Sequence, residues 1–202
     1  MSGTVVRILG IDPGLNFTGY GIVDSNLNGC TRVASGVIKV PEGELSVRLG
    51  YIFKELSTII QTHSPQFSAI EKTFLNTNAQ SSMLLSHARG AAMCAPATVG
   101  IPCYEYSTRE IKKSVTGTGA ADKEQVAAMV LRLVHETDRT FKSDESDALA
   151  VAICCANSMT LQNLLPKTKG VGVSSTGAAR RGGASLRSRT AWTKIYERTS
   201  KS

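Results

Sequence analysis

Apolar residues follow one another with a single interruption near the start of the chain, from Val5 to Ile11. This pattern is typical of a strand buried on both faces, in the middle of a sheet. Asp12 ends the apolar segment, and Pro13 and Gly14 follow it. Because proline cannot continue a central strand and glycine frees the backbone, the chain turns away and leaves the Asp12 carboxylate at the strand tip. Asp12 either accepts hydrogen bonds within its own turn or serves a site at this edge of the sheet.

Two further strand-like segments follow, at residues 18–24 and 30–40, and Asn26-Leu-Asn-Gly29 joins them. An Asn-Gly pair between two β-prone segments is a strong hairpin signal. The first three strands are therefore predicted to form an antiparallel meander.

Helical and strand-like patterns alternate in the next part of the chain. Apolar residues recur at helical spacing over residues 44–62, which predicts an amphipathic helix that ends before Ser64-Pro65. The short strand-like segment 67–71 comes next, and a strand reached through a crossover helix is usually parallel to its neighbour. Residues 78–97 predict a second helix, rich in small residues, which packs either on its own sheet or against another subunit.

The last predicted elements complete the pattern. Residues 101–106 predict a fifth strand, Ser107 opens a sequence with capping-box spacing, and Asp122 can cap a helix that runs to about His135. A final helix is expected over residues 143–164. The order βββαβαβααα predicts an α/β domain, in which helices flank both faces of a five-stranded mixed sheet.

Charge divides the chain into two parts. The net charge is +7, but residues 1–164 carry 14 Lys or Arg against 15 Asp or Glu, whereas residues 165–202 carry 9 against 1. The second part is rich in Gly, Ser, Thr, Ala and basic residues and cannot bury enough apolar surface to order itself. We therefore predict one domain over 1–164 and a flexible basic tail over 165–202, which is attracted to polyanions such as nucleic acid or an acidic membrane surface. Within the tail, Trp192, Ile195 and Tyr196 can dock a partner or stack on bases.

Cysteine usage and hydropathy predict where the protein resides. The 5 cysteines form no C-x-x-C pair, their number is odd, and no signal-peptide pattern opens the chain, so we expect a reduced protein in the cytoplasm. The longest apolar segment, residues 148–156, is far shorter than the roughly 20 residues that a membrane-spanning helix needs. We therefore expect no association with a membrane through a spanning segment.

Four carboxylates are placed where they can converge. Asp12 and Glu71 each end a strand, and if these strands are parallel neighbours their ends lie about 5 Å apart, at an edge where α/β sheets bind ligands. Asp144 and Asp147 are spaced i, i+3 at the start of the last helix and share a face, although Asp144 could simply cap that helix. Asp147 lies where the helix enters the core, so its charge needs a partner or a metal. Carboxylate oxygens suit Mg²⁺ or Mn²⁺, and two such ions about 3.5–4 Å apart can bind the attacking and leaving oxygens of a phosphoryl displacement.

Four motifs, in this order, resemble the RuvC-type Holliday-junction resolvases, the crossover junction endodeoxyribonucleases of the ribonuclease H-like superfamily. They are ILGIDPGLNFTGYG at 8–21, AIEKTF at 69–74, HARG at 87–90 and SDESDALA at 143–150. The resemblance implies a ribonuclease H-like fold and a homodimer that nicks a four-way DNA junction at symmetric positions, in strands of like polarity, during recombination and repair. It also implies two Mg²⁺ ions per active site, for which Mn²⁺ can substitute, and the branch-migration proteins RuvA and RuvB as partners.

The resemblance assigns roles to individual residues. The acids that match the family's catalytic, metal-binding positions are Asp12, Glu71, Asp144 and Asp147. Phe74 matches an aromatic residue that acts on bases at the junction, although it could also be an ordinary core residue. Lys112 and Lys123 match basic positions implicated in DNA contact, and Lys123 also lies at a helix start beside a Gly-rich segment, where backbone N–H groups favour phosphate. Arg109 and Lys113 are candidates for the same DNA-binding groove.

Three alternatives stay open. The first is a ribonuclease H-like enzyme that acts on RNA or another branched substrate. The second is a non-catalytic DNA-binding protein that relies on its basic tail. The third is an ATPase of the actin or sugar-kinase type, because Gly10-Ile-Asp-Pro-Gly14 and the following hairpin resemble the first phosphate loop of that class; such folds need two lobes, and this chain has room for one. Two features depart from the resolvase family: residues 1–164 are nearly neutral, and the tail is longer than the family's usual ending.

Overall fold

The computed structural model describes residues 5–72, 79–136 and 139–164. Phe74 lies outside these ranges. The predicted tail over residues 165–202, with its Trp192, Ile195 and Tyr196 cluster, also lies outside the described residues. The domain boundary near residue 164 therefore stays a prediction.

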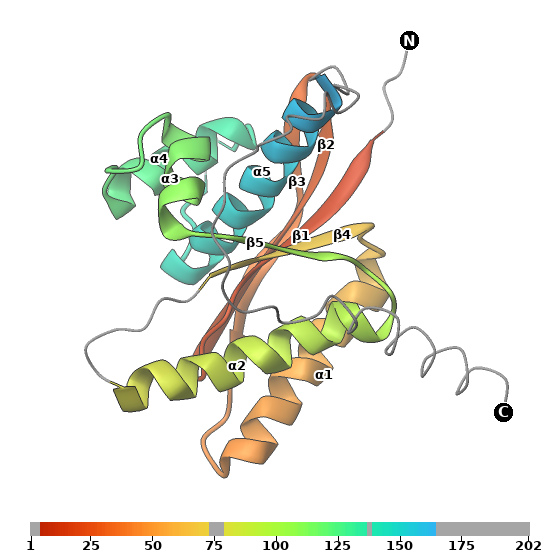
Figure 1. Cartoon of the computed structure of the whole chain (residues 1–202), viewed down its shortest axis with the longest axis vertical. Helices are drawn as coiled ribbons and strands as arrows, with labels where there is room; N and C mark the ends of the chain where they lie inside the picture. Colours follow the sequence, from red (N-terminus) through yellow and green to blue (C-terminus); the bar gives the residue numbers. More distant parts are fainter. Residues whose placement is uncertain (1–4, 73–78, 137–138, 165–202) are drawn as a thin grey trace, which may run out of the picture. The chain divides into compact units, whose positions relative to one another are not determined.

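Five strands form one mixed sheet within the described ranges, in the order β3-β2-β1-β4-β5 (Figure 1). At its centre β1 (Val6–Asp12) pairs antiparallel with β2 (Phe17–Asn26) and parallel with β4 (Phe67–Glu71). The edge strands are β3 (Gly29–Lys39), antiparallel to β2, and β5 (Cys103–Tyr106), parallel to β4. This topology confirms the predicted meander, the parallel return of the fourth strand and the mixed five-stranded sheet.

The hairpin between β2 and β3 differs in detail from the Asn-Gly pattern that predicted it. Asn26 and Gly29 face each other as the last paired residues of the two strands, so Leu27 and Asn28 form the turn itself. The backbone N–H of Asn28 donates to Oδ1 of Asn26 at 2.7 Å, which closes a local side-chain turn. Gly29 has a φ of +132° at the start of β3, a conformation that favours glycine.

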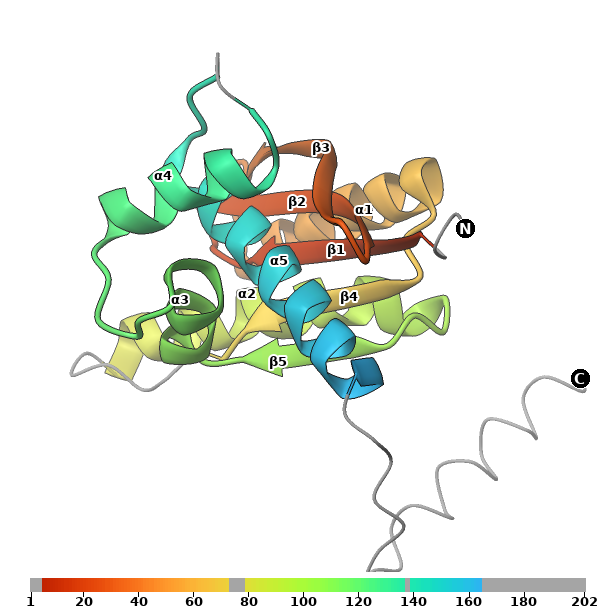
Figure 2. The same cartoon turned by 90° about the horizontal axis from the view of Figure 1, so that it is seen from above.

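Helices cover both faces of the sheet, as Figures 1 and 2 show. One face carries α1 (Leu45–His63) and α2 (Ala79–Thr98), and the other carries α3 (Thr108–Thr116), α4 (Lys123–Leu133) and α5 (Ser143–Leu164). The predicted capping box at Ser107 and the predicted cap at Asp122 are both present, and Asp122 also forms a full capping box at the start of α4. No helix in the described part of the chain is both long enough and apolar enough to span a bilayer.

The central strand β1 contributes to both halves of the apolar core. Ile8 belongs to the cluster formed with α3, α4 and α5, whereas Leu9 and Ile11 belong to the cluster formed with α1 and α2. All three side chains are at most 1 % exposed. This burial on both faces explains the nearly continuous apolar pattern of the sequence, and it places the end of β1 inside the molecule, between the two helical layers.

Candidate active site

The carboxyl ends of β1 and β4 meet the start of α5 at one end of the sheet, on the left in Figure 1. Asp12 and Glu71 end these neighbouring parallel strands, directly after the paired residues Ile11 and Ile70. Asp144 and Asp147 come from the first two turns of α5, where Ser143 is the first helical residue, so Asp144 is not the N-cap. The structure brings all four acids together: they line one pocket of about 340 Å³.

Glycines in β1 and β2 let α5 lie directly on the sheet. Gly10 and Gly21 pair with each other, and a Cβ built on Gly10 would overlap the backbone oxygen of Ala148 in α5. Gly19 pairs with Asp12, and a Cβ built on Gly19 would overlap the backbone oxygen of Asp144. Since only glycine leaves room for this approach, these positions determine how close Asp144 comes to Asp12.

The pocket has an excess of negative charge. Burial is the main reason that the pKa of Asp12 rises from 3.8 to about 7, and the nearby carboxylates of Asp147, Glu71 and Asp144 act in the same direction. Burial also raises the pKa of Asp147. The Lys123 ammonium opposes both shifts and lies 3.6 Å from Oδ2 of Asp147, but its side chain is 73 % exposed and water weakens the pairing. A cation in the pocket would relieve this repulsion.

The donor set fits a hard divalent cation, although it is not a ready-made cage. Within the described ranges, no group of three or more His, Cys, Asp and Glu side chains is arranged so as to hold a metal ion as it stands. Two of the acids are engaged by other groups, since the hydroxyl of Thr108 donates to Oε1 of Glu71 and Lys123 pairs with Asp147. Binding of Mg²⁺ or Mn²⁺ by these carboxylate oxygens would therefore require the side chains to exchange those partners for the ion.

Two residues around Glu71 were not predicted from the sequence. Thr108, the first residue of α3, donates to the Glu71 carboxylate and lines the pocket. Arg89 of α2 donates through Nε to the backbone oxygen of Glu71 at 3.1 Å and forms an ion pair with Glu105 of β5. Arg89 belongs to the HARG motif, which could have marked it as a candidate site residue. Thr108 lies within the capping-box sequence at 107–110, whose role in starting α3 already accounted for the residues there.

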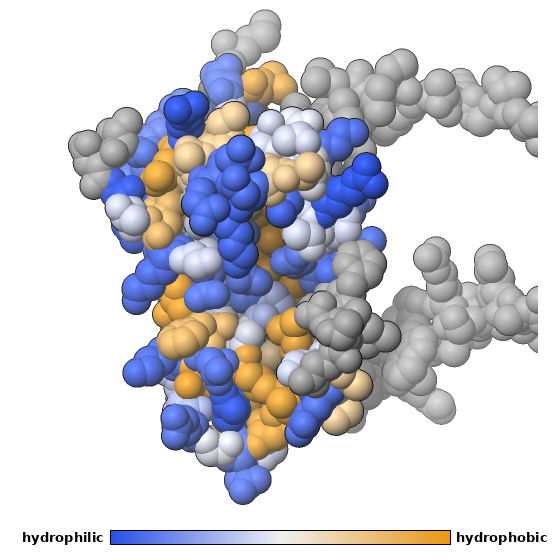
Figure 3. All heavy atoms as spheres, turned by 90° about the vertical axis from the view of Figure 1, so that its left-hand side faces the viewer, coloured by the Kyte–Doolittle hydropathy of each residue, from blue (hydrophilic) through white to orange (hydrophobic). Residues whose placement is uncertain are grey.

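The predicted DNA contacts divide into two groups. Among the described residues, Lys112 of α3 and Lys123 of α4 line the pocket beside the acids, whereas Arg109 and Lys113 lie outside the lining. Arg109 instead packs its side chain against Gly119, where an added Cβ would lie 2.6 Å from its Cγ. Figure 3 shows this end of the molecule, where hydrophilic and apolar side chains are mixed on the surface and a group of apolar ones lies at the centre of the lower half.

Comparison with known proteins gives a consistent set of matches. The family model described as crossover junction endodeoxyribonuclease RuvC matches residues 8–155. The crossover junction endodeoxyribonuclease RuvC of Paraburkholderia phytofirmans is 48% identical over 160 residues, which cover 79% of this chain and 88% of that protein. The solved structure of Thermus thermophilus RuvC has a TM-score of 0.71 at 27% identity and covers 78% of this chain and 97% of its own. The same T. thermophilus protein in complex with a Holliday junction substrate has a TM-score of 0.73 at 27% identity, over 78% of this chain and 96% of its own.

Proposed function

The chain belongs to the RuvC family of crossover junction endodeoxyribonucleases, and we propose that it cuts DNA with two Mg²⁺ ions bound by Asp12, Glu71, Asp144 and Asp147. As a member of this family it is a structure-selective endonuclease, a hydrolase of phosphodiester bonds that resolves Holliday junctions in DNA recombination and repair. The observation that carries the metal assignment is the convergence of four acids on one pocket, at the sheet edge where β1 and β4 end.

Asp12 has the central role in the proposed mechanism. Its neighbours are Glu71 on the adjacent strand and the two aspartates of α5, so it can hold one cation with Asp144 or Asp147 and the other with Glu71. When bound, such a pair of cations activates water for in-line attack and stabilises the leaving 3′ oxygen. The pKa of Asp12 near 7 means that its proton must leave before it becomes a ligand, and Lys123 favours that loss.

The two pocket lysines are suited to holding the DNA strand. Lys123 is largely exposed, so its ammonium is accessible to a phosphate of a bound DNA strand. Lys112 lines the same pocket from α3. We propose that both lysines contact the phosphates next to the scissile bond, and that Phe74, Arg109 and Lys113 contact DNA further from it. The basic tail over 165–202 would add non-specific affinity for DNA.

The wider assignments rest on the family. T. thermophilus RuvC has been solved with a Holliday junction substrate, and we propose that this chain binds the same four-way junction, as a homodimer. Paired symmetric nicks require two active sites, which a dimer supplies. We further propose that RuvA and RuvB are its partners, that it works in the cytoplasm, and that Mn²⁺ can replace Mg²⁺.

One assay separates this function from the alternatives. A labelled four-way junction, a linear duplex and an RNA–DNA hybrid are each incubated with the protein, with Mg²⁺ or with a chelator. We expect symmetric nicks in the junction alone and only with Mg²⁺. Preferential cutting of the hybrid would instead favour a ribonuclease H-like enzyme on RNA. Binding without any cutting, lost when residues 165–202 are removed, would favour a non-catalytic DNA-binding protein, and ATP turnover would favour the kinase-like class.

A further inference from the structure

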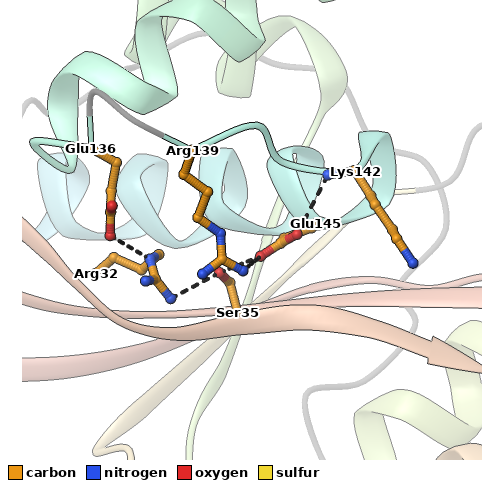
Figure 4. A network of polar contacts seen from close by, with 6 residues as sticks. All are labelled: Arg32, Ser35, Glu136, Arg139, Lys142 and Glu145. Carbon is orange, nitrogen blue, oxygen red and sulfur yellow. Dashed lines mark hydrogen bonds and ion pairs between the residues drawn. The ribbon is translucent and has the colours of Figure 1, made fainter.

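A fifth acid, Glu145, lies between the two aspartates of α5 and is buried away from the pocket. Its side chain is 6 % exposed and accepts hydrogen bonds from Oγ of Ser35 at 2.6 Å and from Nη2 of Arg139 at 3.0 Å (Figure 4). The backbone N–H of Lys142 also donates to it, at 3.4 Å. A buried carboxylate is tolerated only with such compensating partners, so these contacts hold Glu145 in place.

Helical geometry connects Glu145 to the pocket acids. Successive residues of an α-helix are about 100° apart around the axis, so Asp144 and Asp147 are about 60° apart and share a face. Glu145 is about 160° from Asp147 on the same helical turn. The contacts of Glu145 therefore fasten the side of the turn that faces away from Asp147. Any rotation of α5 about its axis would break these contacts and carry both aspartates with it.

The partners of Glu145 are themselves fixed to neighbouring elements. Ser35 belongs to β3, and Arg32 of the same strand donates to its Oγ at 3.4 Å and to Oε1 of Glu136 at 2.8 Å. The guanidinium of Arg139 lies 5.4 Å from the ring centre of Phe141. Figure 4 shows the resulting network between β3 and the start of α5, with the Lys142 side chain pointing away from it. The network joins the edge strand to the segment that leads into α5.

We propose that Glu145 is a positioning residue of the nuclease: with Ser35 and Arg139 it holds the first turn of α5 in the rotation that presents Asp144 and Asp147 to Asp12. The inference rests on the metal-binding role proposed for those aspartates. Glu145 is not one of the described residues that line the pocket, so it acts through its neighbours and not on the substrate.

The test compares Glu145→Gln with a matched control, Asp24→Asn. The control breaks the ion pair in which Nε of Arg7 lies 2.8 Å from Oδ1 of Asp24. This pair spans β1 and β2 at the opposite end of the ladder from Asp12 and Gly19, so the control removes an ion pair of the sheet without touching α5. Ser35→Ala is a second variant, which removes the anchor from the strand side and leaves every acid in place.

Four quantities are measured for each variant: the Mg²⁺ concentration that gives half-maximal cleavage of a four-way junction, the affinity for Mn²⁺ measured by electron paramagnetic resonance, the affinity for the junction, and the urea midpoint. For Glu145→Gln we expect both metal affinities to fall by about tenfold, since the loss of residues that orient metal ligands has effects of this size. High Mg²⁺ should restore most of the cleavage rate, and junction affinity should stay at the wild-type value. Ser35→Ala should shift the metal affinities in the same direction, and Asp24→Asn should change only the urea midpoint.

Equal metal affinities in Glu145→Gln, Ser35→Ala and Asp24→Asn would overturn the proposal, because the network would then contribute stability alone. If Glu145→Gln does not fold, Ser35→Ala decides by the same measurements. If the wild-type protein fails to cut the junction, the proposed function is wrong, yet the Mn²⁺ affinities still decide whether the network positions the acids.

Discussion

The two helical layers reach the sheet in different ways. On one face, α1 packs through large apolar side chains, and Ile52 and Leu56 are fully buried against Leu9 of β1 and its neighbours. On the other face, the backbone of α5 lies directly against Gly10 and Gly19, where there is no room for a side chain. Both layers bury apolar side chains, but only α5 also brings its backbone against the glycines of the strands.

This difference bears on the two pocket aspartates, Asp144 and Asp147, which belong to α5. A layer of flexible side chains can absorb a small displacement by repacking, whereas a helix seated on glycine passes any displacement on to Asp144 and Asp147. Catalysis by metal ions depends on ligand position to within a fraction of an ångström. We therefore expect substitutions under α5 to reduce activity and substitutions under α1 to reduce stability.

The largest effect is expected for Asp12→Asn, which removes the carboxylate at the centre of the pocket beside α5. Loss of the central carboxylate should lower junction cleavage by about 10³-fold or more, while binding of the junction stays intact because the lysines remain. Nicking of a labelled junction at saturating protein measures the rate, and a gel-shift assay in Ca²⁺ measures binding. Asp24→Asn is the control, and a variant that keeps cleaving at a rate near that of the control would contradict the assignment.

Gly19→Ala tests the close packing of α5 on β2 without removing any acid. The added Cβ would meet the backbone of Asp144, so the helix must move, and cleavage should fall by about 100-fold. Gly50→Ala on α1 is the matched control, since a Cβ there meets no described atom within 4 Å and alanine favours the helix. If Gly19→Ala cleaves as fast as Gly50→Ala, the close approach of α5 has no part in catalysis.

Leu56→Ala tests the opposite layer. Its side chain is fully buried, so truncation should lower the free energy of unfolding by about 2–5 kcal/mol. The cleavage rate of the folded fraction should not change, because α1 carries none of the four pocket acids. Urea unfolding and single-turnover cleavage measure the two quantities, and Leu27→Ala, at a side chain that is 78 % exposed, serves as the control. A large loss of cleavage in a fully folded Leu56→Ala protein would show that both layers position the site.

The last prediction concerns the pH dependence of stability that the raised pKa of Asp12 imposes. Below pH 3.8 the carboxyl is protonated in both the folded and the unfolded chain, so the wild type and the Asp12→Asn variant should differ little in this respect. Between pH 3.8 and about 7 the unfolded chain releases this proton and the folded chain keeps it, so wild-type stability falls relative to Asp12→Asn as pH rises, by about 1.4 kcal/mol per pH unit at most. Above pH 7 the difference is constant.

Urea unfolding in a chelator at pH 5 and pH 8 measures this difference. Asp12→Asn should be more stable than the wild type at pH 8, by more than at pH 5, and added Mg²⁺ should remove the advantage because only the wild type gains from binding the ion. A wild-type protein that is as stable as the variant at pH 8 without metal would show that Asp12 is not under the strain that burial and its neighbours imply.

Local patterns predicted most of the fold. The apolar segment of β1, the caps of α3 and α4 and the crossover between parallel strands depend on residues close together in sequence, and they also placed Asp12 and Glu71 at adjacent strand ends. The contacts that hold the site depend on pairs far apart in sequence. Ser35 and Glu145 are 110 residues apart, and Thr108 is 37 residues from Glu71. The sequence displays these residue types, but only the packing of α5 and α3 on the sheet brings the partners together.

The central claim is that Asp12, Glu71, Asp144 and Asp147 jointly bind the divalent cations that cut the junction. Crystals of the protein with a four-way junction, soaked in Mn²⁺ and measured at a wavelength where manganese scatters anomalously, test it most directly. We expect anomalous peaks inside the pocket, within bonding distance of Asp12 and of at least one acid on each side of it. Cleavage in Mn²⁺ by a protein whose pocket holds no such peak, with the ions bound elsewhere, would contradict it.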